Sequence, residues 1–268
     1  MKKPLALSLI IPAYNEEQHL TMCLDAVAAQ TRMPAEVIVV DNNSTDGTVK
    51  LAKKYPFVRV IHEKRQGVVF AGSTGYNAAK YELIGRIDAD TVMPPKWIES
   101  IATFYSEPSN RDVIFTGSGT YYNTPFPRIS AIAFDILAFR VNRVALGHHF
   151  SYGSNMVLPK KIWRDIKDDI CLRTDIHDDV DISVHAHRAG YKIRYVPKIQ
   201  VKTKLRRVFQ DQSKLWGVLM LWPKTMRVHN NWTWPLGFWG ALQIYILTPL
   251  LYPLEWLHEL RLKLSKKR

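Results

Sequence analysis

The segment Glu36-Val-Ile-Val-Val-Asp-Asn-Asn-Ser-Thr-Asp-Gly47 joins a run of mostly β-branched residues to a cluster of turn-forming residues. An apolar run without alternation is typical of a strand that is covered on both faces, as in a parallel sheet. Asn, Ser, Asp and Gly favour the turn that leads from such a strand into a helix. Turn chemistry explains Asp41 less well, because this residue directly ends the apolar strand.

Strand and helix patterns alternate around this segment. We expect further strands at residues 7–11, 58–61 and 83–87, and helices at residues 17–30, 45–55, 67–80 and 97–105. Strands separated by such helices predict an α/β fold with a mostly parallel, Rossmann-like sheet flanked by helices. Ligands of such sheets bind beyond the carboxyl ends of the strands. Asp41, Asp88 and Asp90 should therefore face one crevice.

The second half of the chain is less regular. We expect strands at residues 113–121, 155–158 and 193–196, and helices at residues 129–146, from 159 or 160 onward, and 178–189. We divide the chain into a catalytic domain at residues 1–205 and a basic, aromatic helical segment at residues 206–268. Within the first domain, residues 1–122 form the donor half and residues 123–205 the acceptor half.

The net charge of +13 predicts an anionic partner, such as nucleic acid, nucleotide phosphates or a membrane surface. No stacking module accompanies the basic residues, so we do not expect nucleic acid. Cys23 and Cys171 match no metal-ligand spacing and fit a reducing cytosol better than a disulfide framework. The apolar run at residues 5–13 lacks a small-residue cleavage site, and we interpret it as a strand and not as a targeting segment.

Residues 230–254 contain no charged side chain and are rich in Trp, Leu, Tyr and Phe. Their length permits a bilayer crossing, but Pro235, Pro249 and Pro253 interrupt helix geometry. Basic residues on both flanks oppose a single crossing. We expect a re-entrant or interfacial segment on the cytoplasmic face of an anionic membrane, with a buried helix as the alternative.

Two groups of carboxylates could carry chemistry. Asp88-Ala-Asp90 follows a predicted strand, and carboxylates there suit Mg²⁺ or Mn²⁺, which would neutralise charge on a leaving diphosphate. Asp178, Asp179 and Asp181 open a predicted helix, where acidic residues favour the helix dipole. Helix capping is therefore one explanation of the second group, and a general base is the other.

Six segments of this chain resemble, in order and spacing, the motifs of the family 2 glycosyltransferases of GT-A fold. They are Ile11-Pro-Ala-Tyr-Asn-Glu16, Val39-Val-Asp-Asn-Asn-Ser-Thr-Asp-Gly47, Asp88-Ala-Asp90, Gly153-Ser-Asn155, Asp178-Asp-Val-Asp-Ile182 and Arg188-Ala-Gly-Tyr-Lys192. The resemblance covers residues 7–196. It implies an inverting transferase that uses a nucleoside-diphosphate sugar, with UDP as the expected nucleotide.

The resemblance also implies a role for each matched residue. The nucleotide-sugar pocket would be lined by Pro12, Tyr14, Glu16, Asp41, Gly67 and Asp88, with Asp41 at the nucleobase. Asp90 would ligate the metal, with Asp88 on the ribose or the metal. Asp179 would be the general base that deprotonates an acceptor hydroxyl, and Asp178 would be its catalytic neighbour.

Three departures from the family pattern refine this expectation. Asp178 stands where the family usually has Glu. The helix after Gly67 lacks the usual arginine, so Lys64, Arg65 or Arg86 would contact the diphosphate. Gln212-Ser-Lys-Leu-Trp216 departs from the Gln-x-x-Arg-Trp element of processive members, which predicts transfer of a single sugar. We expect the hydroxyl acceptor to be lipid-linked or close to the membrane.

Two other functions compete with this one. A catalytically silent nucleotide-sugar-binding membrane protein would share the fold, but retention of Asp41, Asp90 and Asp179 together argues against it. A nucleotidylyltransferase would need a glycine-rich loop after the first strand, and residues 12–17 contain no glycine. The histidines at 148, 149, 177, 185 and 187 are expected to be structural or to lie near the acceptor. Among them, His177 has the position that best suits an active site.

Overall fold

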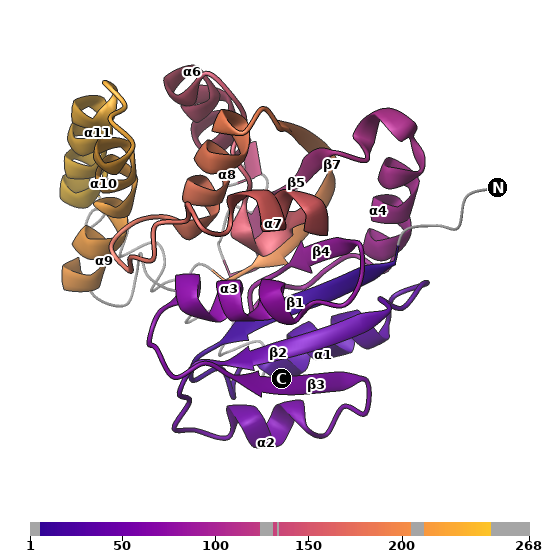
Figure 1. The fold of residues 1–268 in the computed structure, drawn as a ribbon. Coiled ribbons are helices and arrows are strands. Elements are labelled where there is room, and N and C mark those ends of the chain that lie inside the picture. Colours follow the sequence, from indigo (N-terminus) through magenta and orange to yellow (C-terminus); the bar gives the residue numbers. More distant parts are fainter. Residues whose placement is uncertain (1–5, 124–130, 133, 205–211, 248–268) are drawn as a thin grey trace.

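The computed structural model describes residues 6–123, 131–132, 134–204 and 212–247. These residues form a seven-stranded sheet with the order β3-β2-β1-β4-β6-β5-β7, drawn in Figure 1. Its strands are β1 (Leu7–Ala13), β2 (Glu36–Asp41), β3 (Val58–His62), β4 (Leu83–Arg86), β5 (Val113–Tyr121), β6 (Met156–Pro159) and β7 (Lys192–Thr203). Strands β1 to β4 are parallel, as is the pair β5 and β7, whereas β6 runs antiparallel to β4 and β5. The sheet is therefore mixed, with a parallel half that carries the first motifs.

Helices cover both faces of the sheet. They are α1 (Leu20–Ala28), α2 (Thr48–Ala52), α3 (Val68–Ala78), α4 (Trp97–Ser106), α7 (Lys160–Ile166) and α8 (Asp178–Arg188). One core lies between the sheet and α1, α2 and α4, and a second lies between the sheet and α3, α7 and α8. Leu9 and Ile11 point into the first core and Ile10 into the second. Burial on both faces is why these strands are apolar without alternation.

The register of the parallel strands sets the edge at which ligands can bind. Ala13 at the end of β1 pairs with Asp41 at the end of β2, and Asp41 pairs with His62 at the end of β3. Strand β4 joins the same edge through the pairing of Ile10 with Arg86. Asp41 and the segment 88–90 therefore leave the sheet on one side, as the sequence predicts.

Strand β7 is much longer than the expected 193–196. It pairs with all of β5, with a shift of register between Gly117 and Ser118. Charged residues alternate with apolar ones along it, and Lys198 and Lys202 are exposed. Pro197 lies where the register shifts, a place that tolerates a residue without an amide hydrogen.

The described part of the expected helix at 129–146 is helical: a π-helix, η2 (Phe134–Val141), leads directly into α6 (Asn142–Leu146). Short 3-10 turns, η1 (Pro108–Asn110) and η3 (Gly153–Asn155), precede β5 and β6. Residues 124–130 and 133 lie outside the described residues.

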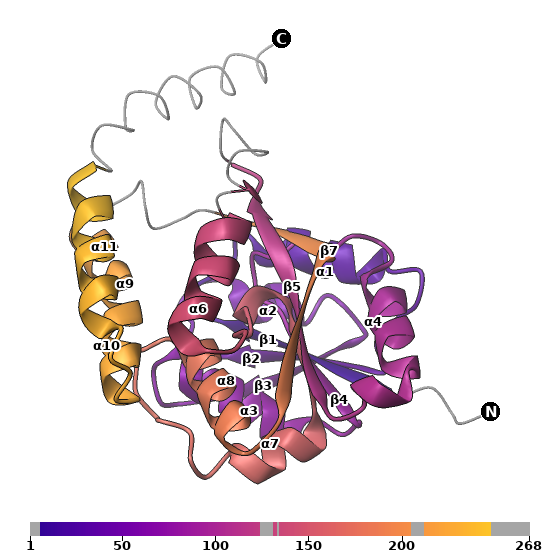
Figure 2. The ribbon, with the colours of Figure 1, turned by 90° about the horizontal axis from the view of Figure 1, so that it is seen from above.

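Three helices make up most of the described residues that follow β7. Helices α9 (Gln212–Leu219), α10 (Leu221–Val228) and α11 (Trp234–Leu247) stand together beside α6 and α8, as Figures 1 and 2 show. Met226 of α10 packs in a third core with Phe150, Val180 and Val184. No helix among the described residues is long and apolar enough to cross a membrane. Residues 205–211 and 248–268, with Pro249 and Pro253, lie outside the described part.

Candidate active site

The loops after β1 and β2 are joined by hydrogen bonds into one unit. The backbone amide of Asn15 donates to Ser44 Oγ (3.1 Å), and that of Thr45 donates to Asn15 Oδ1 (2.8 Å). The amide of Glu16 donates to Thr48 Oγ1 (2.7 Å). Asn15 has a φ of 54°, in the left-handed region that asparagine tolerates. Many polar residues of both motifs thus build the loops, and Tyr14 is left exposed above them.

Asp41 is buried at the end of β2, and both of its carboxylate oxygens have partners. Oδ1 accepts the amide of Ser44 (3.2 Å), and Oδ2 lies 3.0 Å from His62 Nδ1. The His62 side chain is 59% exposed. Sequence reasoning missed His62, although an imidazole at the end of the neighbouring strand β3 is the signal that could have found it.

Gly67 lies close to the segment that precedes α8. Its amide donates to Asn42 Oδ1 (2.7 Å), while Asn42 Nδ2 donates to the carbonyl of Arg65 (2.7 Å). The φ of Gly67 is 137°, which L side chains rarely adopt. A Cβ there would lie 2.5 Å from Cγ2 of Thr174, in the segment before α8. Glycine therefore permits this close approach.

Asp88 and Asp90 follow β4 and share their surroundings with Glu16. Asp90 is buried, and the Asp88 side chain is 40% exposed. Burial raises the pKa of the Cys23 thiol, and the charges of Asp90, Asp88 and Glu16 raise it further. The charges of all three carboxylates thus act on the Cys23 thiol. Asp88 and Asp90, two aspartates at a strand end, offer the oxygen ligands that Mg²⁺ or Mn²⁺ takes.

Arg86 is buried and contacts two carboxylates. Its Nη1 donates to Asp178 Oδ2 (2.6 Å), and its Nη2 donates to Asp88 Oδ1 (3.3 Å). Of the other two cations expected at the diphosphate, Arg65 pairs with Glu63, and Lys64 is exposed. Arg86 thus connects the end of β4 to the start of α8.

Lys204 is a further cation near the loop after β1. Its Nζ lies 3.1 Å from His19 Nε2, and His19 Nδ1 lies 3.3 Å from Glu16. The end of β7 is carried to this place by an antiparallel bridge between Val92 and Lys202. Residue 92 is two positions beyond Asp90, which puts the end of β7 beside the segment that follows the candidate metal ligands.

Asp178 and Asp179 begin α8 and point to different partners. Asp178 is buried against Arg86. Burial raises its pKa to about 6, and the charges of Asp179 and Asp88 add to this, while Arg86 opposes it. Asp179 is half-buried, with Oδ2 accepting the amide of Gly153 (2.8 Å) and Oδ1 the amide of Val180 (2.9 Å). Only the contact with Val180 is of the kind that capping explains.

The turn Gly153-Ser-Asn155 joins the two carboxylate groups. The amide of Gly153 reaches Asp179, and Oγ of the next residue, Ser154, donates to Asp88 Oδ2 (2.5 Å). A Cβ on Gly153 would lie 2.7 to 2.9 Å from guanidinium atoms of Arg86. Glycine is thus needed for the guanidinium to pack here.

Asn155 fixes this turn to the rest of the fold. Its Nδ2 donates to the carbonyls of Ser118 (2.8 Å) and Ile199 (2.9 Å), and its Oδ1 accepts Trp97 Nε1 (2.8 Å). The side chain is fully buried. These hydrogen bonds give Asn155, the asparagine of the Gly-x-Asn motif, a structural role.

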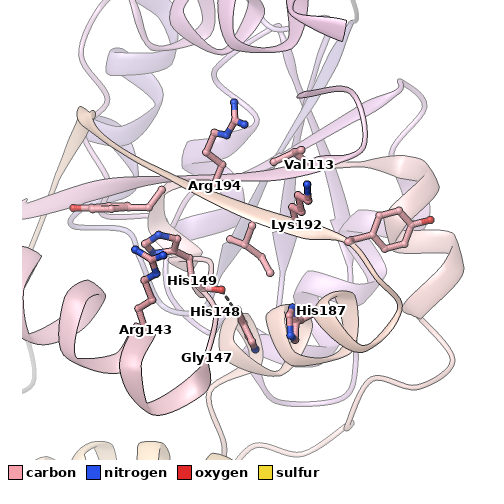
Figure 3. A pocket seen from close by; sticks show the side chains of 11 residues that line it. Val113, Arg143, Gly147, His148, His149, His187, Lys192 and Arg194 are labelled. Atoms are coloured by element: carbon pink, nitrogen blue, oxygen red, sulfur yellow. Dashed lines mark hydrogen bonds between the residues drawn. The ribbon is translucent and has the colours of Figure 1, made fainter. Parts of the chain in front are cut away.

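A separate basic hollow of about 370 Å³ lies beside β7 and α8 (Figure 3). Its lining includes Arg143, His148, His149, His187, Lys192 and Arg194. Burial lowers the pKa of both His148 and His149, and the His148 ring stacks on His187. None of the five candidate aspartates lines this hollow.

Comparison with known proteins decides the family. The family model described as glycosyl transferase family 2 matches residues 8–166, more than half of the chain. The chain belongs to glycosyl transferase family 2. Among curated members, it is 31% identical to the glycosyltransferase YibD of Escherichia coli over 134 residues, 46% of this chain and 39% of YibD. It is 34% identical to the glycosyltransferase AglE of Haloferax volcanii over 99 residues, 34% of this chain and 33% of AglE. The matches thus span about two fifths or less of these relatives.

Solved structures of glycosyltransferases share the fold. The mannosyltransferase PcManGT from Pyrobaculum calidifontis, in complex with GDP-Man and Mn²⁺, superposes with a TM-score of 0.63 at 17% identity, over 96% of this chain and 74% of that one. TarS of S. aureus, in complex with UDP-GlcNAc, gives a TM-score of 0.60 at 16% identity, over 91% of this chain and 81% of that one. This family 2 member therefore has the GT-A fold.

Proposed function

We propose that the chain transfers one sugar from a nucleoside-diphosphate sugar to a hydroxyl acceptor, with inversion at the anomeric carbon. The observation that carries this proposal is the turn at Gly153 and Ser154, which links Asp88 on the donor side to Asp179 at the start of α8. A metal-binding carboxylate and a base on two sides of one turn are the two parts that such a transfer needs. The neighbours bound to UDP-GlcNAc and GDP-Man support a nucleotide-sugar donor.

In this proposal the donor lies over the joined loops after β1 and β2. Pro12, Tyr14, Glu16 and Gly67 line its pocket. Asp41, whose carboxylate contacts His62, recognises the nucleobase. Uracil is the base that we expect. Lys204, held near His19 and Glu16, takes the diphosphate contact that Arg86 cannot make while it pairs with Asp88 and Asp178.

The reaction follows from these positions. Asp179 accepts the proton of the acceptor hydroxyl, and the acceptor oxygen forms a bond to the anomeric carbon. The bond from that carbon to the diphosphate oxygen breaks, and its electron pair leaves with the nucleoside diphosphate. Mg²⁺ or Mn²⁺ held by Asp90 and Asp88 would neutralise the charge that develops there. Asp178 and Arg86 keep Asp88 and the start of α8 at a fixed separation.

The acceptor is proposed to be lipid-linked or close to the cytoplasmic face of a membrane. Trp232, Leu236 and Trp239, which precede or lie in α11, are 79%, 63% and 60% exposed. Exposed tryptophans beside apolar residues are typical of segments that lie in a membrane interface. The net charge of +13 adds attraction to anionic lipid.

Donor turnover tests the catalytic part of the proposal. UDP- and GDP-sugars are screened for slow hydrolysis by the purified protein with Mn²⁺, and the best donor is used with Asp90→Asn and Asp179→Asn. Removal of a general base should lower the rate about 100- to 10,000-fold. Asp175→Asn is the matched control, because Asp175 pairs with Arg173 on the surface and should be dispensable.

Full activity of either active-site variant, with an unchanged circular dichroism spectrum, would contradict the assignment. Binding of UDP by the wild type without any turnover above the Asp179→Asn level would favour the catalytically silent nucleotide-sugar-binding protein instead.

A further inference from the structure

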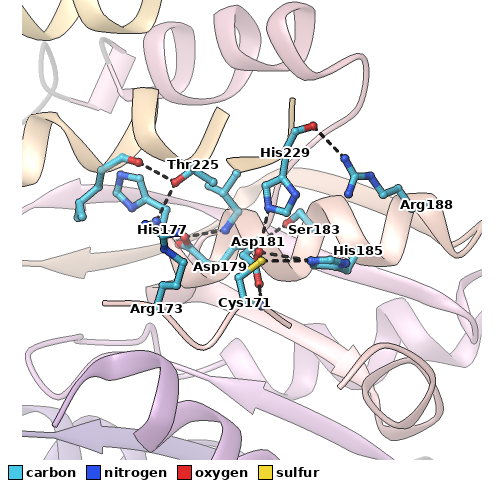
Figure 4. Close-up of polar contacts among 12 residues, drawn as sticks. Cys171, Arg173, His177, Asp179, Asp181, Ser183, His185, Arg188, Thr225 and His229 are labelled. Atoms are coloured by element: carbon cyan, nitrogen blue, oxygen red, sulfur yellow. Dashed lines mark hydrogen bonds and ion pairs between the residues drawn. The ribbon is translucent and has the colours of Figure 1, made fainter. Parts of the chain in front are cut away.

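Four potential metal ligands from three parts of the fold meet behind the candidate base. They are Cys171 in the segment after α7, Asp181 and His185 on α8, and His229 directly after α10. Their ligand atoms all lie within 4.8 Å of one another. Figure 4 shows the four side chains pointing toward one another. We infer that they bind one Zn²⁺ ion, at a site distinct from Asp88 and Asp90.

The distances suit a tetrahedral ion. Cys171 Sγ lies 3.8 Å from His185 Nε2, His185 Nε2 lies 3.4 Å from Asp181 Oδ1, and His229 Nε2 lies 2.8 Å from the same Oδ1. Zinc bonds of about 2.0 to 2.3 Å at tetrahedral angles separate ligand atoms by roughly 3.2 to 3.8 Å. Movements of about 1 Å or less would therefore bring every pair into this range.

The donor chemistry selects zinc among common ions. One thiolate, two imidazoles and one carboxylate form a set that Zn²⁺ accepts, whereas Mg²⁺ and Ca²⁺ prefer oxygen ligands alone. Four protein ligands complete a tetrahedral shell, which is typical of a structural zinc and not of a catalytic one. Asp181 and His229 are buried while Cys171 and His185 are partly exposed, so an ion can enter from their side.

The arrangement does not suit a Cys–His–Asp nucleophile. In such a triad the histidine contacts the thiol with one ring nitrogen and the carboxylate with the other. Here Nε2 of His185 makes both contacts, and His229 also directs its Nε2 to Asp181. Nε2 of His185 and Nε2 of His229 both approach Asp181 Oδ1, as ligands around one shared ion would.

Neighbouring hydrogen bonds hold two of the ligands in place. Asp181 Oδ2 accepts the backbone amide of Cys171 (3.0 Å), and the carbonyl of His229 accepts Nη2 of Arg188 (2.9 Å). Such outer contacts orient ligands for a metal. A bound ion would fasten the C-terminal helices to α8, two residues beyond Asp179, and so stabilise the position of the candidate base.

Metal analysis tests this inference. All variants carry Asp90→Asn, which removes the proposed donor metal. After gel filtration in a weak chelator, the zinc content of this parent should be about one ion per chain. Exchange with Co²⁺ should give the visible bands of a tetrahedral ion and a cobalt–thiolate charge-transfer band.

The two partly exposed ligands, Cys171 and His185, give variants that should still fold. Cys171→Ser should remove the charge-transfer band, and His185→Gln should weaken Zn²⁺ binding by at least about 100-fold, more than loss of an outer contact does. His187→Gln is the matched control, since His187 is on the same helix but stacks on His148. Cys23→Ala is the control for the thiolate.

Two results would overturn the inference. One is a parent protein that retains no zinc and gives no cobalt–thiolate band. The other is a zinc content and cobalt spectrum that are the same in Cys171→Ser and His185→Gln as in the parent.

Discussion

Gly153 is the residue at which the candidate donor and base groups meet. A methyl group there would lie within 3 Å of the Arg86 guanidinium, which is buried between two carboxylates and cannot move away easily. We expect Gly153→Ala to lower the free energy of unfolding by about 1 to 3 kcal/mol, as overpacking does. Donor turnover should fall more than 10-fold, since the contact to Asp179 is displaced.

Urea denaturation and a turnover assay check this prediction. Gly217→Ala is the matched control, because a Cβ there would meet no described atom within 4 Å apart from the backbone of its own helix, and α9 should gain slightly from alanine. Equal stability and activity of the two alanine variants would contradict the close packing at Gly153.

Asp178 should produce a pH dependence of its own. Its pKa of about 6 means that it is charged above this pH and pairs with Arg86, and protonated below it. Activity should therefore fall as the pH falls through about 6. The measurement is a profile of kcat/KM against pH. In Asp178→Asn the fall of kcat/KM near pH 6 should disappear, and kcat/KM should fall only at lower pH. An unchanged fall in the variant would assign it to another group.

At the residue scale, motifs predict which carboxylates gather but not what holds them. Asp41, Asp88 and Asp90 can be located because each follows a recognisable strand. Their partners His62 and Ser154 are 21 and 66 residues away in sequence, so only the folded chain brings them together. The same holds for His229, which is 48 residues from Asp181.

At the scale of elements, the parallel half of the sheet is predictable because its strands are buried on both faces. Strand β7 is predicted only at residues 193–196, because its exposed lysines and Pro197 interrupt the apolar pattern that marks a strand. The change from the π-helix η2 to the α-helix α6 has no marker in the sequence, because the two form one uninterrupted helical stretch. Pairing with β5 lengthens β7, and such pairing is a tertiary property.

The start of α8 depends on α10 for one hydrogen bond. The backbone amide of His177 donates to Oγ1 of Thr225, which is fully buried. Thr225→Val keeps the shape of the side chain but removes this hydrogen bond, so the free energy of unfolding should fall by about 0.5 to 1.5 kcal/mol. Thr103→Val, at an exposed threonine of α4, should change it by less than about 0.5 kcal/mol. Similar values for the two variants in urea titrations would show that the contact contributes nothing.

At the scale of the whole molecule, exposed tryptophans and a net charge of +13 predict reversible binding to anionic vesicles. Replacing both Trp232 and Trp239 by serine should weaken co-sedimentation with such vesicles about 10-fold or more, since large apolar side chains no longer enter the interface. Met33→Ser, at an exposed residue between α1 and β2, should have no effect. Binding that is insensitive to the tryptophans, or equal for neutral and anionic vesicles, would argue against this mode of attachment.

Nucleotide binding and catalysis are expected to depend on different carboxylates of one site. Calorimetric titration of UDP, and in parallel GDP, into wild type, Asp90→Asn and Asp179→Asn with and without Mn²⁺ separates them. We predict that wild type and Asp179→Asn bind one of the two nucleotides equally well with Mn²⁺, and that Asp90→Asn loses the manganese-dependent part of the affinity. Binding of neither nucleotide by the wild type, or the same manganese dependence in Asp90→Asn, would contradict the account.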